Sequence, residues 1–265
     1  MTTVARIGVT PLKGTRLLHP TSVELTPLGI PGNRRFHLVN ERGELFSCGD
    51  FGPLMRVGAA YDAATETLTL DLPGGTSVSV GRRDLGAPHV TDFYGRPVPG
   101  RFVEGPAAAA LSAYVGRPLR LVRADAEGDG PDEHRLTLLS LASVEDLGAR
   151  HGRPDLAPGR FRMNLELDGC APYEEDDWSG AAVRVGTAVI RVLGPVPRCV
   201  ATTCDPETGA KDFDTLKAIS AYRPLMAHPR GVPFGMYAEV ETPGRVAVGD
   251  VVGPARGASA PFGRG

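Results

Sequence analysis

The sequence predicts a mainly β protein with a few helices, arranged as two barrel-like units. Its 265 residues include 34 glycines and 24 prolines, which suits many short strands joined by tight turns better than a helical bundle. Several short runs are rich in β-branched residues and alternate apolar with polar positions, as expected for a sheet with one solvated face. A hydrophobic content of 42% is enough to bury one large core or two adjoining ones.

The first unit is predicted over residues 1–118. The pattern indicates single strands over 4–10 and 22–28, a hairpin joining 35–39 to 44–46, and a second hairpin joining 66–72 to 76–80. A helix should follow between Pro106, which suits a helix start, and Gly116, which suits a helix stop. The chain would leave its first β unit after this helix.

The second unit is predicted over residues 119–252. Ser143 and Asp146 have capping-box spacing and predict the start of a short helix that Gly152 closes. The other expected elements are strands over 119–125 and 164–169, a hairpin over 182–194 around Gly186-Thr187, a helix over 213–223 and a hairpin over 235–252 around Pro243-Gly244. Residues 253–265 show no core-forming pattern, so we expect a disordered tail there.

Composition argues against several functional classes. The formal net charge is −2, from 29 basic and 31 acidic residues, so no overall field favours nucleic acid or an anionic membrane. We find no run of about 20 apolar residues and no apolar signal segment near the N-terminus, which predicts a cytoplasmic protein without membrane association. Four cysteines are too few for a disulfide framework, and we expect reduced thiols.

The stretch "RCVATTCDP" at residues 198–206 is the main candidate for chemistry. Cys199 and Cys204 have the spacing that opens one type of iron–sulfur site, but position 207, where a third cysteine would fall, is Glu. The histidines show no zinc-type spacing either, so the two thiols could simply be small core residues. Against that interpretation, Arg198 favours a thiolate at Cys199, and Gly194, Pro195 and Pro197 break the preceding strand and predict a turn at a sheet end.

Four ordered blocks carry a resemblance to a known family. The blocks "FRMNLELDGCAPYEEDDWSG", "RCVATTCDPETG", "AYR" and "PFGMYAEVETPGRVAVGDVV" resemble the molybdenum cofactor sulfurase C-terminal (MOSC) domain. The stretch "PLKGTRLLHPTSVELTPLGIPGNRRFHLVNERGELFS" is similar to the N-terminal β-barrel domain that precedes it in the amidoxime reducing component family. The resemblance runs from about residue 4 to 252 and implies a MOSC-type β-barrel after an N-terminal β-barrel-like domain.

The resemblance also implies a set of site residues. It makes Cys199 the ligand of a molybdenum that is held by a pterin dithiolene, and it leaves Cys204 at a position that is usually apolar. Cofactor binding falls to four cationic residues and one amide, because guanidinium and ammonium groups suit a phosphate: Lys13, Arg34, Arg162, Asn164 and Arg198. Asp205 fits a carboxylate that orients the loop or moves protons near the metal, although "DPETG" is also an ordinary turn sequence.

The sequence departs from the family pattern at three positions around this site. Asn33 replaces the usual acidic residue before Arg34, which alters how that arginine is held. The segment "FSCGDFGPL" lacks a basic residue that commonly follows its strand, and Pro197 stands where a hydroxyl residue is frequent. We expect these changes to alter the contacts made to the phosphate of the implied cofactor and the choice of substrate.

The resulting hypothesis is an enzyme, a molybdenum cofactor-dependent oxidoreductase that removes oxygen from small N-oxygenated or similar substrates. No ferredoxin-like sequence follows residue 252, so a separate ferredoxin- or flavoprotein-type protein would supply the electrons. The alternative is a sulfur carrier or small-molecule biosynthetic enzyme that uses Cys199 without molybdenum, with Cys204 as a resolving thiol.

Overall fold

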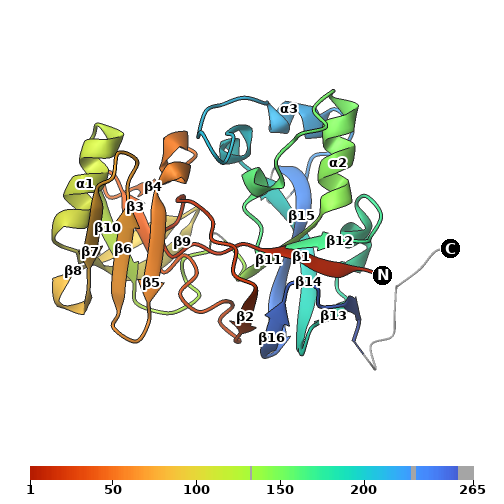
Figure 1. Cartoon of the computed structure of the whole chain (residues 1–265), viewed down its shortest axis with the longest axis horizontal. Coiled ribbons are helices and arrows are strands. Elements are labelled where there is room, and N and C mark those ends of the chain that lie inside the picture. The colour runs from red at the N-terminus through yellow and green to blue at the C-terminus, as the bar shows by residue number, and fades with distance from the viewer. Residues whose placement is uncertain (132, 228–230, 256–265) are drawn as a thin grey trace.

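The computed structural model describes residues 1–131, 133–227 and 231–255, and it folds into two β-rich lobes (Figure 1). The N-terminal lobe holds a five-stranded sheet in the order β4-β3-β10-β9-β8 and a three-stranded sheet, β5-β6-β7. The C-terminal lobe holds a seven-stranded sheet in the order β1-β12-β11-β15-β14-β13-β17. An isolated bridge between Thr3 and Val251 brings the edges of this sheet together, so it is a nearly closed barrel. The mainly β fold that the sequence predicts is confirmed.

The strands and helices have the following bounds. The strands are β1 (Thr3–Ile7), β2 (Ser22–Leu25), β3 (Phe36–Val39), β4 (Leu45–Phe46), β5 (Gly58–Asp62), β6 (Thr67–Asp71), β7 (Ser77–Val80), β8 (Leu85–Phe93), β9 (Arg96–Val103), β10 (Arg120–Ala124), β11 (Leu136–Ser140), β12 (Leu165–Asp168), β13 (Ala182–Val185), β14 (Ala188–Arg198), β15 (Val232–Thr242), β16 (Gly244–Ala247) and β17 (Val252–Pro254). The helices are α1 (Pro106–Val115), α2 (Leu141–Arg150) and α3 (Thr215–Ser220).

Each lobe has its own apolar core. The N-terminal core includes Leu38, Leu54, Leu70 and Leu111, so α1 packs its buried side onto the sheets of that lobe. The barrel core of the C-terminal lobe is rich in valine, leucine and isoleucine, and a further cluster under α2 and α3 contains Leu147. No helix in the described part of the chain is long and apolar enough to cross a membrane.

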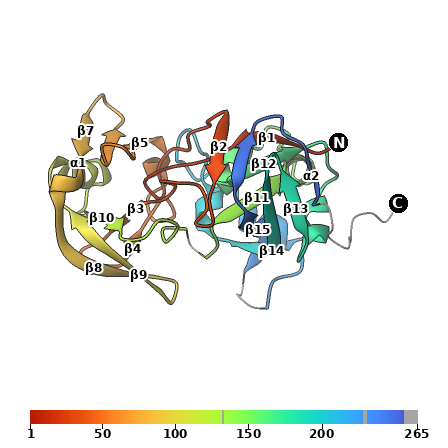
Figure 2. The same cartoon turned by 90° about the horizontal axis from the view of Figure 1, so that it is seen from below.

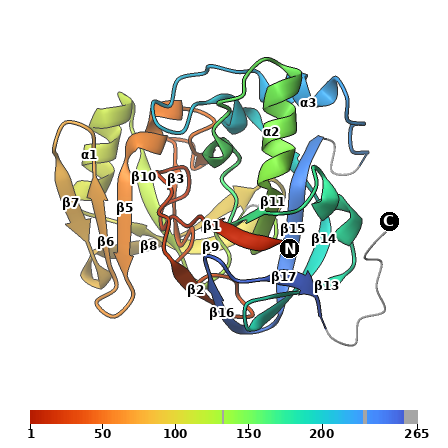
Figure 3. The same cartoon turned by 45° about the vertical axis from the view of Figure 1, so that its right-hand side comes forward.

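The chain passes between the lobes more than once. β1 and β2 come from the first 25 residues but pair with β12 and β16 of the C-terminal lobe (Figures 1 and 3). β10 follows α1 in sequence yet pairs with β3 and β9 in the N-terminal lobe. The predicted division at residue 118 stays a prediction, because the sheets exchange strands across it. These crossings bring loops of both lobes to one place, where the candidate site lies.

Several predicted elements are confirmed. The hairpins β3-β4, β6-β7 and β13-β14 form, the last with Val185 paired to Ala188 around the Gly186-Thr187 turn. α1 begins at Pro106 and ends where Gly116 adopts a left-handed conformation with φ 78°. Residues 252–254 form β17, so the prediction of a disordered tail is wrong at residues 253 and 254. Residues 256–265 of that prediction lie outside the described chain.

The strands β5, β8, β9 and β11 were not predicted, and in β8 and β9 the prolines argue against strands. β8 and β9 form a long hairpin that projects along one side of the N-terminal lobe (Figure 2). Pro97 and Pro99 lie on the part of β9 that pairs only with the edge strand β8, since β10 pairs with β9 from Gly100 onwards. Proline cannot donate to a ladder, and this position on β9 needs no donor toward β10.

Two other predictions are wrong. α2 begins at Leu141 after Ser140, so Ser143 and Asp146 lie inside the helix and do not form its capping box. The Ser143 hydroxyl donates to the buried Glu175 carboxylate at 3.0 Å instead. Around Pro243-Gly244 the chain turns without forming a hairpin, because β16 pairs with β2 and not with β15.

Candidate cofactor and active site

One cavity is lined by residues from both lobes, and we call it the inter-lobe cavity. The N-terminal half contributes Lys13, Arg34, Cys48 and Tyr94, while the C-terminal half contributes residues before β12 and at the end of β14. Six of the seven residues that the sequence singled out lie in its lining: Lys13, Arg34, Arg162, Asn164, Arg198 and Cys199. Asp205 does not lie among the lining residues described.

Cys199 presents its thiol at the end of β14. The side chain is exposed, in contrast to Cys48 and Cys204, which are buried. The turn that follows is held by its own hydroxyls, since Thr202 Oγ1 donates to the Cys199 carbonyl at 3.0 Å and Thr203 Oγ1 donates to the Val200 carbonyl at 2.7 Å. The two threonines of the "RCVATTCDP" stretch therefore fix the loop that carries the thiol.

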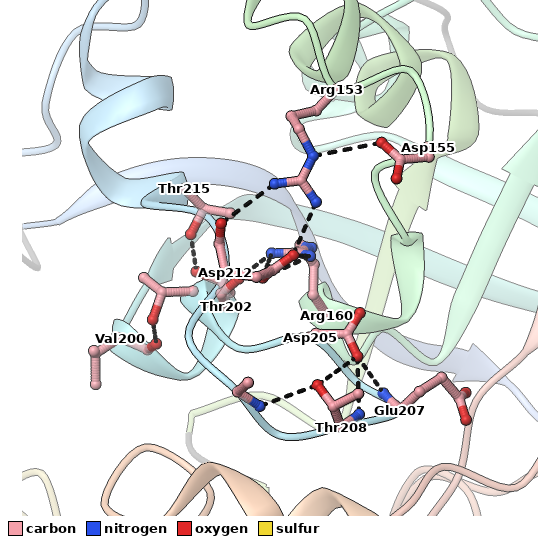
Figure 4. Close-up of polar contacts among 12 residues, drawn as sticks. Arg153, Asp155, Arg160, Val200, Thr202, Asp205, Glu207, Thr208, Asp212 and Thr215 are labelled. Carbon is pink, nitrogen blue, oxygen red and sulfur yellow. Dashed lines mark hydrogen bonds and ion pairs between the residues drawn. The ribbon is translucent and has the colours of Figure 1, made fainter.

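Arg160, which was not predicted as a site residue, supports the turn that follows Cys199. Its side chain is 1% exposed, and Nη1 donates to the Thr202 carbonyl at 3.2 Å (Figure 4). Both terminal nitrogens donate to the Asp212 carboxylate at 3.2 Å, and that carboxylate also accepts from Arg153 Nη2 at 2.9 Å. Position 160 stands just before the block that carried the resemblance, so only its place in the chain could have drawn attention to it.

Arg34 and Arg162 both adopt left-handed backbone conformations, with φ of 53° and 55°. Residues other than glycine rarely hold such angles, and they do so mainly where the surrounding structure requires it. Arg34 Nη2 donates to the Arg162 carbonyl at 3.2 Å, and Arg162 Nη2 donates to the Thr15 carbonyl at 2.6 Å. The two arginines thus connect loops of both lobes at the wall of the cavity.

Asn33 holds the loop that carries Arg34. Its Oδ1 accepts from the Thr10 backbone amide at 3.0 Å, while the Arg34 amide donates to the Thr10 carbonyl at 2.6 Å. An amide side chain can therefore anchor this loop where the family usually has a carboxylate. The Arg34 loop is therefore held at both the amide and the carbonyl group of Thr10.

Lys13 and Arg198 line the cavity from the N-terminal and the C-terminal half of the chain. Lys13 is 6% exposed, and its Nζ lies 5.4 Å from the centre of the Phe93 ring. Arg198 Nη2 donates to the Phe161 carbonyl and contacts Met163 Sδ, both at 2.8 Å. Burial, with the nearby Lys13 charge, lowers the pKa of His37 to about 3, so that histidine stays neutral beneath Lys13.

Asn164 makes buried hydrogen bonds that give it a structural role without a ligand. Its Oδ1 accepts from both the amide and the hydroxyl of Thr137 at 3.2 Å, and its Nδ2 donates to the Gly8 carbonyl at 3.0 Å. Asn164, just before β12, therefore joins β11 to the residue that follows β1. Its predicted role in binding the cofactor stays a prediction.

Asp205 serves the loop rather than the cavity. Its Oδ1 accepts from the amides of Glu207 and Thr208 and from the Thr208 hydroxyl, at 3.1, 2.8 and 2.9 Å (Figure 4). Burial alone would raise the pKa of Asp205, but these hydrogen bonds outweigh it and lower the pKa. The loop-orienting part of its predicted role agrees with these contacts, while a role in proton transfer stays a prediction.

Cys48 and Cys204 are both buried in the core of the N-terminal lobe, and of the two only Cys48 is among the described lining residues of the cavity. Cys204 is 1% exposed and lies among apolar side chains, as suits a position that is usually apolar. Burial raises the pKa of the Cys48 thiol, which keeps it protonated. The expectation that Cys204 acts as an accessible resolving thiol is therefore wrong, because the fold encloses it.

The charge of the lining is the clearest feature of the cavity. The side chains that carry positive charge are Lys13, Arg34, Arg160, Arg162 and Arg198, and no carboxylate is found among the described lining residues. Nowhere in the described chain do three or more His, Cys, Asp or Glu residues gather as a metal site. One exposed thiol beside five cations suits an anionic cofactor that brings a metal with its own ligands and needs one more from the protein.

The fold and the cavity define a two-lobed β protein whose lobes share a cation-lined cavity with an exposed thiol. Comparison with family models matches the MOSC N-terminal beta barrel domain to residues 1–118 and the MOSC domain to residues 125–253. The chain therefore belongs to the MOSC family in which an N-terminal β-barrel domain precedes the MOSC domain. This confirms the resemblance from which the site residues were taken.

Curated relatives support the same assignment. The chain is 25% identical over 279 residues to mitochondrial amidoxime-reducing component 1 of Homo sapiens and 26% identical over 281 residues to mitochondrial amidoxime reducing component 2 of Bos taurus. Each match covers 94% of this chain and 82% of the relative. A solved structure of the YUAD protein from Bacillus subtilis aligns over 95% of this chain and 94% of its own, with 14% identity and a TM-score of 0.43. The expectation of an oxidoreductase-type enzyme is confirmed at the level of the family.

Proposed function

We propose that this protein binds a molybdenum cofactor in the inter-lobe cavity and reduces small N-oxygenated substrates by removing oxygen. The observation that carries the proposal is the single exposed thiol of Cys199 in a cavity that five cationic side chains line. The names of the amidoxime-reducing relatives supply the substrate class. Both lobes contribute to the lining, so the cofactor would bind only in the folded two-lobed chain.

Particular residues would hold the two ends of the cofactor. Cys199 would bind the metal, and Lys13, Arg34 and Arg162 would bind the phosphate, since the guanidinium fork and the ammonium group suit its oxygens. When bound, the cofactor supplies two-electron chemistry and a place for the oxygen that leaves the substrate. Arg160 and the threonines would keep the thiol in place, because they fix the turn on which it lies.

Substrate would enter beside the thiol. Val200, the neighbour of Cys199, is 39% exposed, and Tyr94, at the tip of the β8-β9 hairpin, is 75% exposed and also lines the cavity. These groups offer an apolar contact next to the cations, which suits a small organic molecule with a polar N–O group. The electrons would come from a separate ferredoxin- or flavoprotein-type partner.

The test is the metal and pterin content of protein produced in a host that makes the cofactor. Wild-type protein should contain molybdenum, Cys199→Ser should lose it, and Arg34→Gln should lower the pterin content, because the phosphate loses a charged partner. Cys170→Ser is the matched control, since Cys170 is only partly exposed and is not part of the described lining. Wild-type protein without molybdenum, or full loading of Cys199→Ser, would contradict the proposal.

A second function keeps Cys199 as a sulfur carrier without metal. The exposure of Cys199 favours it, because a persulfide must be reached by both donor and acceptor. Cys48 and Cys204 are both buried, so the carrier would work without a resolving thiol from this chain. Mass spectrometry separates the two functions: one added sulfur atom on Cys199 in metal-free protein supports the carrier, whereas an unmodified thiol in molybdenum-loaded protein supports the reductase.

A further inference from the structure

A histidine that the sequence analysis did not single out lines the inter-lobe cavity. His134 lies just before β11 and contacts Glu239 of the neighbouring strand β15, with 3.1 Å between His134 Nδ1 and Glu239 Oε1. The side chains are 29% and 47% exposed, so the pair reaches solvent while the histidine also reaches the cavity. In the described lining, no other histidine is present.

The fold holds this histidine in one orientation. β11 and β15 are antiparallel partners in the barrel, with Leu136 opposite Ala238 and Thr137 opposite Tyr237. The His134 ring lies 4.9 Å from the Tyr237 ring at 58°, and Tyr237, 8% exposed, lines the same cavity. Ring contact on one side and a carboxylate on Nδ1 leave Nε2 as the nitrogen available to a bound molecule.

The proposed reaction requires protons that the other lining residues cannot readily give. When an N-hydroxylated group is reduced, two electrons break its N–O bond, one proton turns the departing hydroxyl into water, and a second proton goes to the nitrogen. Arginine and lysine side chains hold their protons near neutral pH, and tyrosine is a weak acid there. Histidine is the side chain type whose ordinary range suits giving and regaining a proton under these conditions.

We propose that His134 is the proton donor to the departing oxygen and that Glu239 is its positioning residue. The inference rests on the proposed function, because the electrons come from the partner protein and the oxygen leaves as water. Glu239 accepts a hydrogen bond from Nδ1–H and so directs Nε2 to the cavity. The doubly protonated ring gives its Nε2 proton to the departing oxygen and becomes the neutral Nδ1–H tautomer, and solvent, which reaches the exposed pair, returns a proton to Nε2 after each turnover. The groups that face His134 or share its cavity are Glu239 and Tyr237 on β15, the cations Lys13, Arg34, Arg160, Arg162 and Arg198, the thiols of Cys48 and Cys199, and Tyr94.

The first test needs no cofactor. Nitrogen-15 chemical shifts of the histidine rings in the metal-free protein report which ring nitrogen carries the proton in the neutral form. We expect the Nδ1–H tautomer at His134 in the wild type and a shift toward the Nε2–H tautomer in Glu239→Ala, since the carboxylate that accepts the Nδ1 proton is gone. An unchanged tautomer in that variant would overturn the positioning role of Glu239.

The second test uses the loaded enzyme with a reduced viologen dye as the electron source and benzamidoxime as the probe. His134→Gln should lower kcat by about 100-fold or more with little change in KM, because a lost general acid acts on the chemical step. Its molybdenum content should equal that of the wild type, and added imidazole should restore part of kcat. His151→Gln is the control, because His151, at the end of α2, contacts the Ala218 carbonyl of α3 and is not among the described lining residues.

The outcomes separate the two proposals. A wild type that turns over and a His134→Gln variant with the same kcat would overturn this inference and leave the proposed function intact. A wild type that binds no molybdenum would overturn the proposed function, and the proton donor with it. Loss of kcat in His134→Gln without rescue by imidazole, together with lowered molybdenum content, would assign His134 a structural role and refute the donor.

Discussion

Replacing the buried Arg160 tests whether its guanidinium group holds the turn over residues 199–203, which carries the Cys199 thiol. Arg160→Met removes a guanidinium that is 1% exposed and makes hydrogen bonds of 3.2 Å to the Thr202 carbonyl and to Asp212. Breaking a buried ion pair costs about 3–5 kcal/mol, but Asp212 is 27% exposed and keeps Arg153. With that partner retained, we expect the free energy of unfolding to fall by about 2–3 kcal/mol.

The matched control removes the other cation of the same carboxylate. Arg153 is 31% exposed, and solvent screens its ion pair, so Arg153→Gln should lower the free energy of unfolding much less than Arg160→Met does. Urea unfolding measures both variants, and molybdenum content measured on the folded protein reports the thiol loop. Equal effects of the two substitutions, or full metal loading of a destabilised Arg160→Met, would refute the argument that Arg160 holds the Cys199 turn.

Two further predictions concern carboxylates outside the cavity. Burial raises the pKa of Glu175 to about 7, so its contribution is favourable at low pH and is lost as the pH rises from about 4.5 through 7. Between pH ~5.5 and pH ~8, the free energy of unfolding of Glu175→Gln, measured with urea, should therefore rise by about 2 kcal/mol relative to that of the wild type. The exposed Glu41→Gln should show no such change. A difference between Glu175→Gln and the wild type that does not vary with pH would contradict the burial argument. Asp205→Asn keeps a side-chain oxygen for the amides of Glu207 and Thr208, so its kcat should stay within about twofold of the wild type. Asp205→Ala loses that oxygen, and its free energy of unfolding should fall by about 1–2 kcal/mol. A large loss of kcat in a stable Asp205→Asn would instead support proton transfer by Asp205.

Local sequence signals predicted the fold correctly where one or two residues determine the backbone conformation of a turn or a helix end. Gly116 ends α1 in a left-handed conformation, and the Gly186-Thr187 pair turns β13 into β14. The Pro243-Gly244 pair failed as a hairpin signal because β16 finds its partner in β2, more than 200 residues earlier. Such pairing depends on the path of the whole chain, which no local pattern contains.

The candidate site also has features that the sequence predicted and features that it could not predict. The ordered blocks were enough to bring Lys13, Arg34, Arg162, Arg198 and Cys199 to one cavity. They could not reveal the left-handed backbone of Arg34 and Arg162, because those angles follow from contacts between segments 128 residues apart. Nor could they reveal His134, whose partner Glu239 lies 105 residues away and becomes adjacent only through the pairing of β11 with β15.

The strand exchange between the lobes explains why the site is where it is. β1 leads directly from the barrel to the Thr10–Lys13 segment, which bonds to the loop of Arg34 and to Phe36 at the start of β3. Any movement of one lobe relative to the other would stretch the contacts of Arg34 with the Arg162 carbonyl and of Arg162 with the Thr15 carbonyl. A bound anion between these arginines would add charge-assisted bonds at the same joint, so loading the cavity should stabilise both lobes together as one cooperative unit.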